Sequence, residues 1–164
     1  MIFAVLLAAA CVSDLRTRRI PNALVLATAI AGIGASVASF GVLHGAGRAF
    51  GGAGVGFALW IPFWLLRMMG AGDVKLFAAG AAWLGPSGAF EGALLSALAG
   101  GILSFVYLLF QHGFSHTVMR LAHGLRQPEA LRQTAPSKWD QRMPYALAMT
   151  TGLLLAAWQP GILI

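Results

Sequence analysis

Two of the five acidic residues occupy positions where a carboxylate can do chemistry. Asp14 ends the apolar segment 1–13, and Asp73 comes shortly before a second apolar stretch. Two carboxyl groups crowded together at low dielectric cannot both ionise easily, so their proton affinities separate. The ionised group can draw a proton from water while the protonated group hydrogen-bonds a peptide carbonyl, as in aspartic proteases. If the fold pairs them, Asp14 and Asp73 predict peptide-bond hydrolysis.

Structural roles are open to each aspartate taken alone. Asp14 could pair with Arg16, and Asp73 could pair with Lys75 or cap a helix that starts at Val74. Polar residues within or beside a membrane are often structural as well as functional. Position alone therefore leaves both readings open.

The composition indicates the environment in which these aspartates lie. Of the 164 residues, 59% are hydrophobic and 10% are charged, whereas a soluble domain carries about 25% charged residues. A membrane helix needs roughly 20 mainly apolar residues, and segment 1–13 approaches that length if its helix continues through Asp14. Five further stretches are candidates: 22–41, 49–66, 76–90, 92–110 and 143–164. We expect one all-α membrane domain over residues 1–164, with about six transmembrane helices.

The basic residues orient these helices. With the N-terminus outside, the inner connections are 14–21, 67–75 and 111–142. They hold ten of the eleven Lys and Arg residues, and the outer connections hold only Arg48. Because Lys and Arg concentrate in cytoplasmic loops, the chain is predicted to be multi-pass with both termini outside. Asp14 and Asp73 then share the inner edge of the bilayer, whereas Glu91 is expected at the outer surface.

Other features of the sequence have structural explanations. Segment 118–126 is amphipathic and is expected on the inner membrane surface, its arginines meeting anionic lipid headgroups. This use of the +6 charge requires no nucleic acid. His112 and His116 have helical spacing, but no Glu lies between them and no third ligand is evident. We expect neither metal nor cofactor. Close helix packing explains a cluster of glycines: Gly47, Gly51, Gly52, Gly54 and Gly56.

Segment 1–13 could also be a cleaved signal peptide, since Ala8-Ala9-Ala10-Cys11 resembles a lipoprotein processing site. A signal peptide carries its positive charge before the apolar core. Here the positive charges follow that core, beginning at Arg16. A first membrane helix is favoured.

Two segments resemble motifs of the type IV prepilin peptidase family. Residues 14–22 read Asp-Leu-Arg-Thr-Arg-Arg-Ile-Pro-Asn, similar to a family motif of Asp, a few polar or basic residues, and Ile-Pro-Asn. Residues 70–76 read Gly-Ala-Gly-Asp-Val-Lys-Leu, similar to the Gly-x-Gly-Asp signature shared with presenilin. Residues 143–146 resemble the proline-containing start of the family's last helix. The helix count and order are similar over the whole chain.

The resemblance implies a GxGD membrane aspartyl protease of the short, tight-adherence (Flp-type) branch, in the bacterial inner membrane. Its substrate would be a prepilin or pseudopilin, cut on the cytoplasmic side after a short basic leader. The implied dyad is Asp14 and Asp73, with motif support from Arg16, Pro21, Asn22, Gly70, Gly72 and Lys75. Longer members carry a cytoplasmic insertion with paired Cys-x-x-Cys motifs and methylate the new N-terminus. With one cysteine and nine residues in the first motif, this chain is predicted to lack methyltransferase activity.

The motif residues also have local interpretations. Pro21 is expected to redirect the chain before the second helix, with Asn22 as that helix's N-cap. Gly70 and Gly72 either permit close backbone approach or form an ordinary interhelical turn. Two other functions remain: a proton-coupled transporter that uses both aspartates as a relay, and a non-catalytic scaffold of a pilus or secretion assembly. A relay is disfavoured because nothing acidic marks a path across the membrane.

Overall fold

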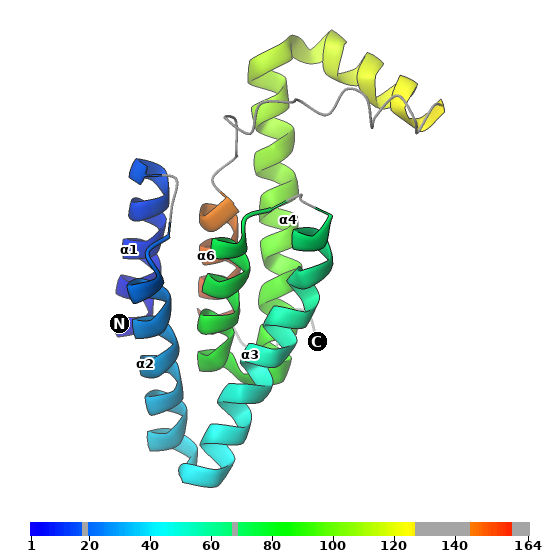
Figure 1. Ribbon diagram of the computed structural model, residues 1–164. Helices are drawn as coiled ribbons and strands as arrows, with labels where there is room; N and C mark the ends of the chain where they lie inside the picture. The colour runs from blue at the N-terminus through cyan, green and yellow to red at the C-terminus, as the bar shows by residue number, and fades with distance from the viewer. Residues whose placement is uncertain (18–19, 67–68, 127–144, 159–164) are drawn as a thin grey trace. The chain divides into compact units, whose positions relative to one another are not determined.

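The computed structural model describes residues 1–17, 20–66, 69–126 and 145–158, with side chains omitted from 107 to 126 and at 145 (Figure 1). These residues contain five helices and no strand: α1 (Ile2–Thr17), α2 (Asn22–Phe40), α3 (Val42–Leu65), α4 (Ala71–Arg126) and α6 (Tyr145–Trp158). The all-α prediction is confirmed. Two segments, Asn22–Phe40 and Ala71–Val106, are long and apolar enough to cross a membrane. A compact unit holds residues 1–100 together with α6, and a second unit begins at Gly101.

The first motif joins α1 to α2. Helix α1 continues through Asp14 to Thr17, as the extension of segment 1–13 required. Pro21 has extended backbone angles, φ −61° and ψ 132°, and its carbonyl accepts the amides of Leu24 and Val25 at 3.0 and 3.3 Å. Pro21 is thus the N-cap, so the prediction of Asn22 as N-cap was wrong. The fixed φ of proline suits a residue directly before a helix.

Helices α2 and α3 are separated by Gly41 alone. Its φ of 82° lies in the left-handed region, which glycine enters without steric cost. The two helices pack closely beside this turn, because a Cβ on Gly45 of α3 would overlap the backbone of Ser36 of α2. The expected start of the third helix at residue 49 was therefore wrong: α3 begins at Val42. The single outer arginine, Arg48, lies inside this helix and not in a loop.

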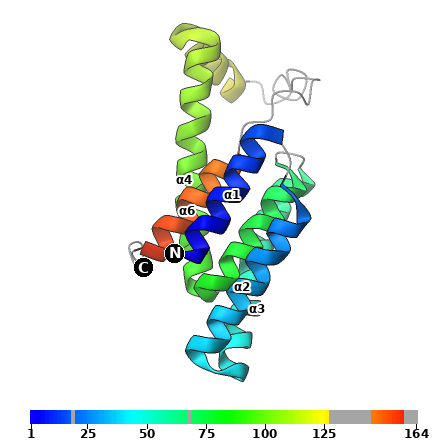
Figure 2. The ribbon, with the colours of Figure 1, turned by 90° about the vertical axis from the view of Figure 1, so that its left-hand side faces the viewer.

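Helix α4 changes direction at Gly85, where φ is 77° and Pro86 follows. Residues 71–85 and 86–100 run side by side in opposite directions (Figures 1 and 2). Arg48 stabilises the turn, since its Nη2 donates to the Leu84 carbonyl at 2.8 Å. The sequence had placed this break near Glu91. That residue lies beyond the turn and is 3% exposed, so its expected place at the outer surface was wrong.

The inner connections are shorter than the sequence indicated. Residues 14–17 belong to α1, and residues 71–75 belong to α4. Helix α4 also runs on to Arg126, so the predicted connection 111–142 begins as helix. The helical conformation of segment 118–126 agrees with its amphipathic pattern. Residues 127–144, including the proline-containing start of the last helix, lie outside the described residues.

The glycines of α3 allow the first part of α4 to pack closely against it. A Cβ on Gly52 would overlap the Ala81 carbonyl oxygen, and a Cβ on Gly56 would lie 2.9 Å from the Cβ of Ala81. Without side chains at these positions the two backbones can touch. Close packing is therefore confirmed for Gly52 and Gly56, whereas Gly47 and Gly54 face open space.

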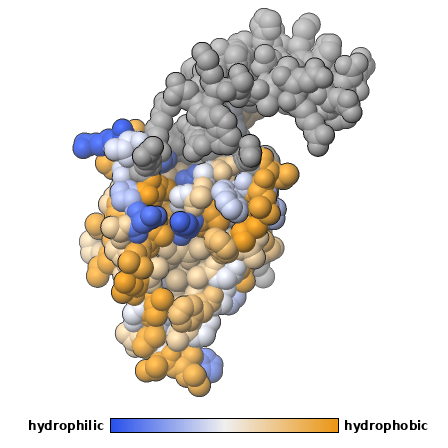
Figure 3. Space-filling view, viewed as in Figure 1, coloured by the Kyte–Doolittle hydropathy of each residue, from blue (hydrophilic) through white to orange (hydrophobic). Residues whose placement is uncertain are grey.

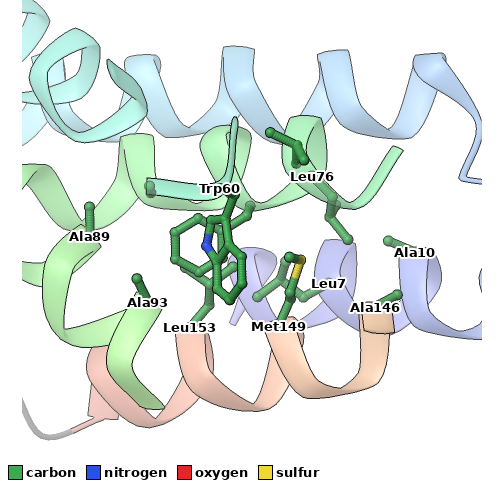
Figure 4. Packing of buried hydrophobic residues seen from close by; sticks show 12 residues of the cluster. Leu7, Ala10, Trp60, Leu76, Ala89, Ala93, Ala146, Met149 and Leu153 are labelled. Atoms are coloured by element: carbon green, nitrogen blue, oxygen red, sulfur yellow. The ribbon is translucent and has the colours of Figure 1, made fainter. Parts of the chain in front are cut away.

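The core of the first unit lies where α1, α3, α4 and α6 meet (Figure 4). Trp60 packs edge-on against Phe77, with ring centroids 5.6 Å apart. The outside of the bundle is also apolar over much of the face in Figure 3. Large exposed hydrophobic residues include Leu26, Ile30, Phe50, Phe57 and Leu98. Such a surface is typical of a protein whose solvent is lipid.

Candidate active site

Asp14 lies on the buried face of α1. Leu7 and Ala10 are fully buried in the core, and Asp14 follows Leu7 by seven residues and Ala10 by four. Residues three, four and seven apart share one face of a helix. The carboxyl group of Asp14 therefore continues the core-facing stripe of α1 and is itself partly buried. Val12 and Leu15, on other faces, are exposed.

Asp73 begins the corresponding stripe of α4. The helix starts at Ala71, so Asp73 lies in its first turn, and the reading of Asp73 as a cap for a helix starting at Val74 was wrong. Leu76 and Phe77, three and four residues later, are both fully buried. Asp73 is thus on the core-facing side of α4 and is partly buried.

The two stripes meet in one core. Leu7 and Ala10 of α1 belong to the same hydrophobic cluster as Leu76 and Phe77 of α4 (Figure 4). The C-terminal end of α1 and the N-terminal end of α4 lie at the same end of the bundle, at the top in Figures 1 and 2. The structure therefore places both aspartates toward the bundle interior, at the end of the bundle where both motifs lie.

Each motif glycine has a distinct neighbour. A Cβ built on Gly70 would lie 3.2 Å from Oδ2 of Asp73, so the carboxylate folds back over this residue. A Cβ on Gly72 would lie 3.7 Å from the Cβ of Ile20, an ordinary van der Waals contact. Gly70 leaves room for the carboxylate, and Gly72 lies against the first motif.

Substitutions should separate the roles of these two glycines. In Gly70→Ala the new methyl group displaces the Asp73 carboxylate, and we expect kcat for the activity proposed below to fall about tenfold, since catalysis is sensitive to small misplacements. Gly72→Ala fits at van der Waals distance and should cost less, about twofold. Initial rates of peptide cleavage with both variants in the same lipid provide the measurement. An equal or larger loss in Gly72→Ala would contradict this assignment.

The basic motif residues point elsewhere. Arg16 and Lys75 are exposed, and each follows its aspartate by two residues, a spacing at which helical side chains do not face each other. Within the described residues no ion pair joins Asp14 to Arg16, so this structural explanation of Asp14 gains no support. Pro21 and Asn22 are also exposed. Sequence reasoning did not single out Ile20, the residue of this motif that lies beside Gly72.

Burial changes the acidity of the first aspartate. Asp14 lies in the last turn of α1, beyond the apolar segment 1–13, and desolvation by the surrounding protein raises the pKa of its carboxyl group above the ordinary value of 3.8. Desolvation disfavours the charged form. Asp14 is therefore suited to carry the proton of a carboxyl pair.

No other constellation of reactive groups accompanies the aspartates in the described part of the chain. Among those residues, no three His, Cys, Asp or Glu side chains gather as metal ligands. Cys11 is a free thiol. The side chains of His112 and His116 lie outside the described ones.

Comparison with known proteins identifies relatives for this arrangement. The sequence model of the type IV leader peptidase family matches residues 1–105, a range that contains both aspartates. A prepilin leader peptidase/N-methyltransferase of Xanthomonas campestris pv. campestris is 35% identical over 102 residues. That match covers 58% of this chain and 35% of the relative, so the chain spans about a third of the relative's length. No solved structure matches the chain.

Proposed function

Because the chain belongs to the type IV leader peptidase family, we propose that it is a membrane aspartyl endopeptidase that removes the basic leader of prepilins or pseudopilins. The observation that carries the proposal is the placement of Asp14 and Asp73 on core-facing stripes that meet in one cluster. In lipid, a side chain at such a position is shielded from bulk water. That shielding lets two carboxyl groups divide the roles of acid and base.

The raised pKa of Asp14 suggests how the roles divide. Protonated Asp14 hydrogen-bonds the scissile carbonyl oxygen, and ionised Asp73 takes a proton from the attacking water. The water oxygen bonds to the carbonyl carbon, and the proton of Asp14 moves to the developing oxyanion. Collapse breaks the C–N bond as Asp73 returns its proton to the leaving amine, while the hydroxyl proton goes back to Asp14. No metal or covalent intermediate enters this sequence.

The substrate has to reach the aspartates at the inner membrane edge. A prepilin has a basic leader inside the cell followed by an apolar helix in the bilayer, so its scissile bond lies near the inner interface. With both termini outside and six membrane crossings, the top end in Figure 1 is the cytoplasmic end. Arg16 and Lys75 are exposed there and repel a basic leader, so anionic headgroups or other residues must attract it.

We also propose that the chain cleaves without methylating. The relative's name includes N-methyltransferase, but the match covers only 35% of that protein. In this chain α1 ends at Thr17 and α2 begins at Asn22. This short connection leaves no room for an insertion between the two helices that flank the first motif. A single-activity peptidase of the tight-adherence (Flp-type) branch fits this connection.

The test is a cleavage assay in vesicles that contain the full chain and a prepilin with a basic leader, with S-adenosylmethionine added. Mass spectrometry should show the leader released and the mature N-terminus unmethylated, with the same result in the presence of a chelator. A methylated product would contradict the single-activity proposal. An uncut prepilin that nevertheless binds the chain would favour the scaffold, and proton uptake without cleavage would favour the transporter.

A further inference from the structure

The connection between α1 and α2 places one apolar side chain against the segment that carries the second aspartate. Ile20 is partly buried and packs on the edge of the core cluster. Its Cβ, Cδ1 and Cγ1 lie 3.7, 3.8 and 3.9 Å from the position of a Cβ on Gly72. Because these are van der Waals distances for an added methyl group, Ile20 lies beside Gly72, the residue that precedes Asp73, at the edge of the core cluster that includes Val74.

The backbone after Ile20 is held in place, and α1 ends at Thr17 in a closed turn. Pro21 follows with φ −61° and starts α2, and a residue before proline is itself kept extended. On the other side, the last turn of α1 is closed by the hydroxyl of Thr17, which donates to the Ser13 carbonyl at 2.8 Å. Ile20 is β-branched, so its side chain has little rotational freedom. A stiff side chain on a constrained backbone can hold a neighbouring segment in a fixed position.

Val74 holds the other side of the same turn. It is 3% exposed and belongs to the core cluster, while Gly72 lies under Ile20. Asp73 therefore lies between Val74, which is held in the core, and Gly72, which lies beside Ile20 of the first motif. Ile20 comes six positions after Asp14, so a short segment joins the first aspartate to the residue that lies beside Gly72.

We propose that Ile20 is a positioning residue, which fixes the first turn of α4 and thereby sets the separation of the Asp73 and Asp14 carboxyl groups. This inference rests on the function proposed above. It explains why an apolar side chain occupies a connection that is otherwise polar and basic. Ile20 touches no reacting atom and acts through its packing against the core at the start of α4.

Kinetics of Ile20→Ala test this role. We expect kcat to fall about tenfold with little change in KM, because the dyad is misplaced while substrate binding is not. Ile20→Val, which keeps the branch at Cβ, should recover most of the loss. Val12→Ala is the matched control, since Val12 is an exposed β-branched residue of α1. The control should retain the wild-type kcat and KM.

The pH profile separates positioning from unfolding. Two carboxyl groups that move apart interact less, so the two apparent pKa values that bound the activity of Ile20→Ala should lie closer together. Partial unfolding lowers the number of active molecules without altering those values. An unchanged profile with an unchanged kcat per folded molecule would overturn the proposal.

A disulfide provides a test that needs no substrate. In a Cys11→Ser background, Ile20→Cys with Gly72→Cys places the two Cβ atoms about 3.7 Å apart, within the usual range for a disulfide. Mild oxidation should form the cross-link, and the cross-linked chain should still cleave, because the bond holds positions 20 and 72 in the arrangement that the wild type has. Loss of cleavage on oxidation, restored by reduction, would show that the contact must open and would overturn the proposal.

These experiments distinguish the two levels of inference. If the wild-type chain cuts no prepilin, the proposed function fails, and Ile20 loses its role in catalysis even where the cross-link forms. If the wild type cleaves and Ile20→Ala cleaves with the same kcat and pH profile, the proposed function stands and the positioning role fails.

Discussion

Asp14→Asn and Asp73→Asn each abolish release of the leader from a co-expressed prepilin. Asparagine keeps the shape of the side chain but can neither accept the proton of water nor donate an acidic one. General acid–base groups contribute about 10²- to 10⁴-fold each, so we expect kcat to fall by at least about a hundredfold in either variant. Gel shift and mass spectrometry of the prepilin measure the outcome. Cleavage retained in one variant would remove that residue from the dyad, and cleavage retained in both would remove the aspartyl mechanism.

Folding has to be shown independently for these variants. Because burial raises the pKa of Asp14, the charged carboxylate costs folding free energy above that pKa, whereas asparagine carries no such cost. Asp14→Asn should melt at or above the wild-type temperature at neutral pH. The difference should shrink as the pH falls toward 3.8, the ordinary value, where the wild-type group is increasingly protonated in both states. A lower melting temperature at neutral pH would mean that the carboxylate has a structural role.

Gly52→Ala should be among the most disruptive single-methyl additions in the bundle. Its Cβ would overlap the carbonyl oxygen of Ala81 and lie 2.9 Å from the backbone of Gly85. Backbone atoms cannot rotate away as a side chain can, so α3 and α4 must separate. Overpacking costs up to about 3 kcal/mol, which corresponds to a fall in melting temperature of roughly 10 °C for a chain of this size. Thermal unfolding in detergent measures the change.

Gly54→Ala provides the control, because nothing lies within 4 Å of a Cβ at that position. Both glycines lie in α3, two residues apart, and both gain helix propensity of about 1 kcal/mol on substitution by alanine. Gly54→Ala should therefore equal or exceed the stability of the wild type. Equal melting temperatures for the two variants would show that α3 and α4 do not approach as described.

Much of the helical architecture could be predicted because apolar length is a strong signal, but two turns were misplaced. Gly41 and Gly85 reverse the chain through positive φ, a property that hydropathy does not report. Arg48 was read as a loop residue because of its charge. Its Nη2 instead donates to the Leu84 carbonyl at 2.8 Å, and its guanidinium carbon lies 4.7 Å from the centre of the Phe40 ring.

The two candidate aspartates were easier to predict from the sequence than the residues around them. Asp14 and Asp73 stood out because acidic residues are rare in this chain, and the residues around them resemble a known pair of motifs. Ile20 did not stand out, since its partner Gly72 is distant in sequence and glycine has no side chain to suggest a contact. Glu91 was misjudged because its burial depends on a turn that lies six residues earlier.

The stripe of Leu7, Ala10 and Asp14 makes the C-terminal end of α1 tolerant of changes in residue type at neighbouring positions. The same stripe makes it intolerant of inserted or deleted residues. Each residue advances a helix by about 100°, given 3.6 residues per turn. Deleting or inserting one residue between Ala10 and Asp14 would swing the carboxyl group toward the lipid, although no atom of the acid had changed. Exchanging exposed Val12 for another apolar residue would leave the Asp14 carboxyl group facing inward. This stretch of α1 therefore has to preserve the number of its residues more strictly than their types.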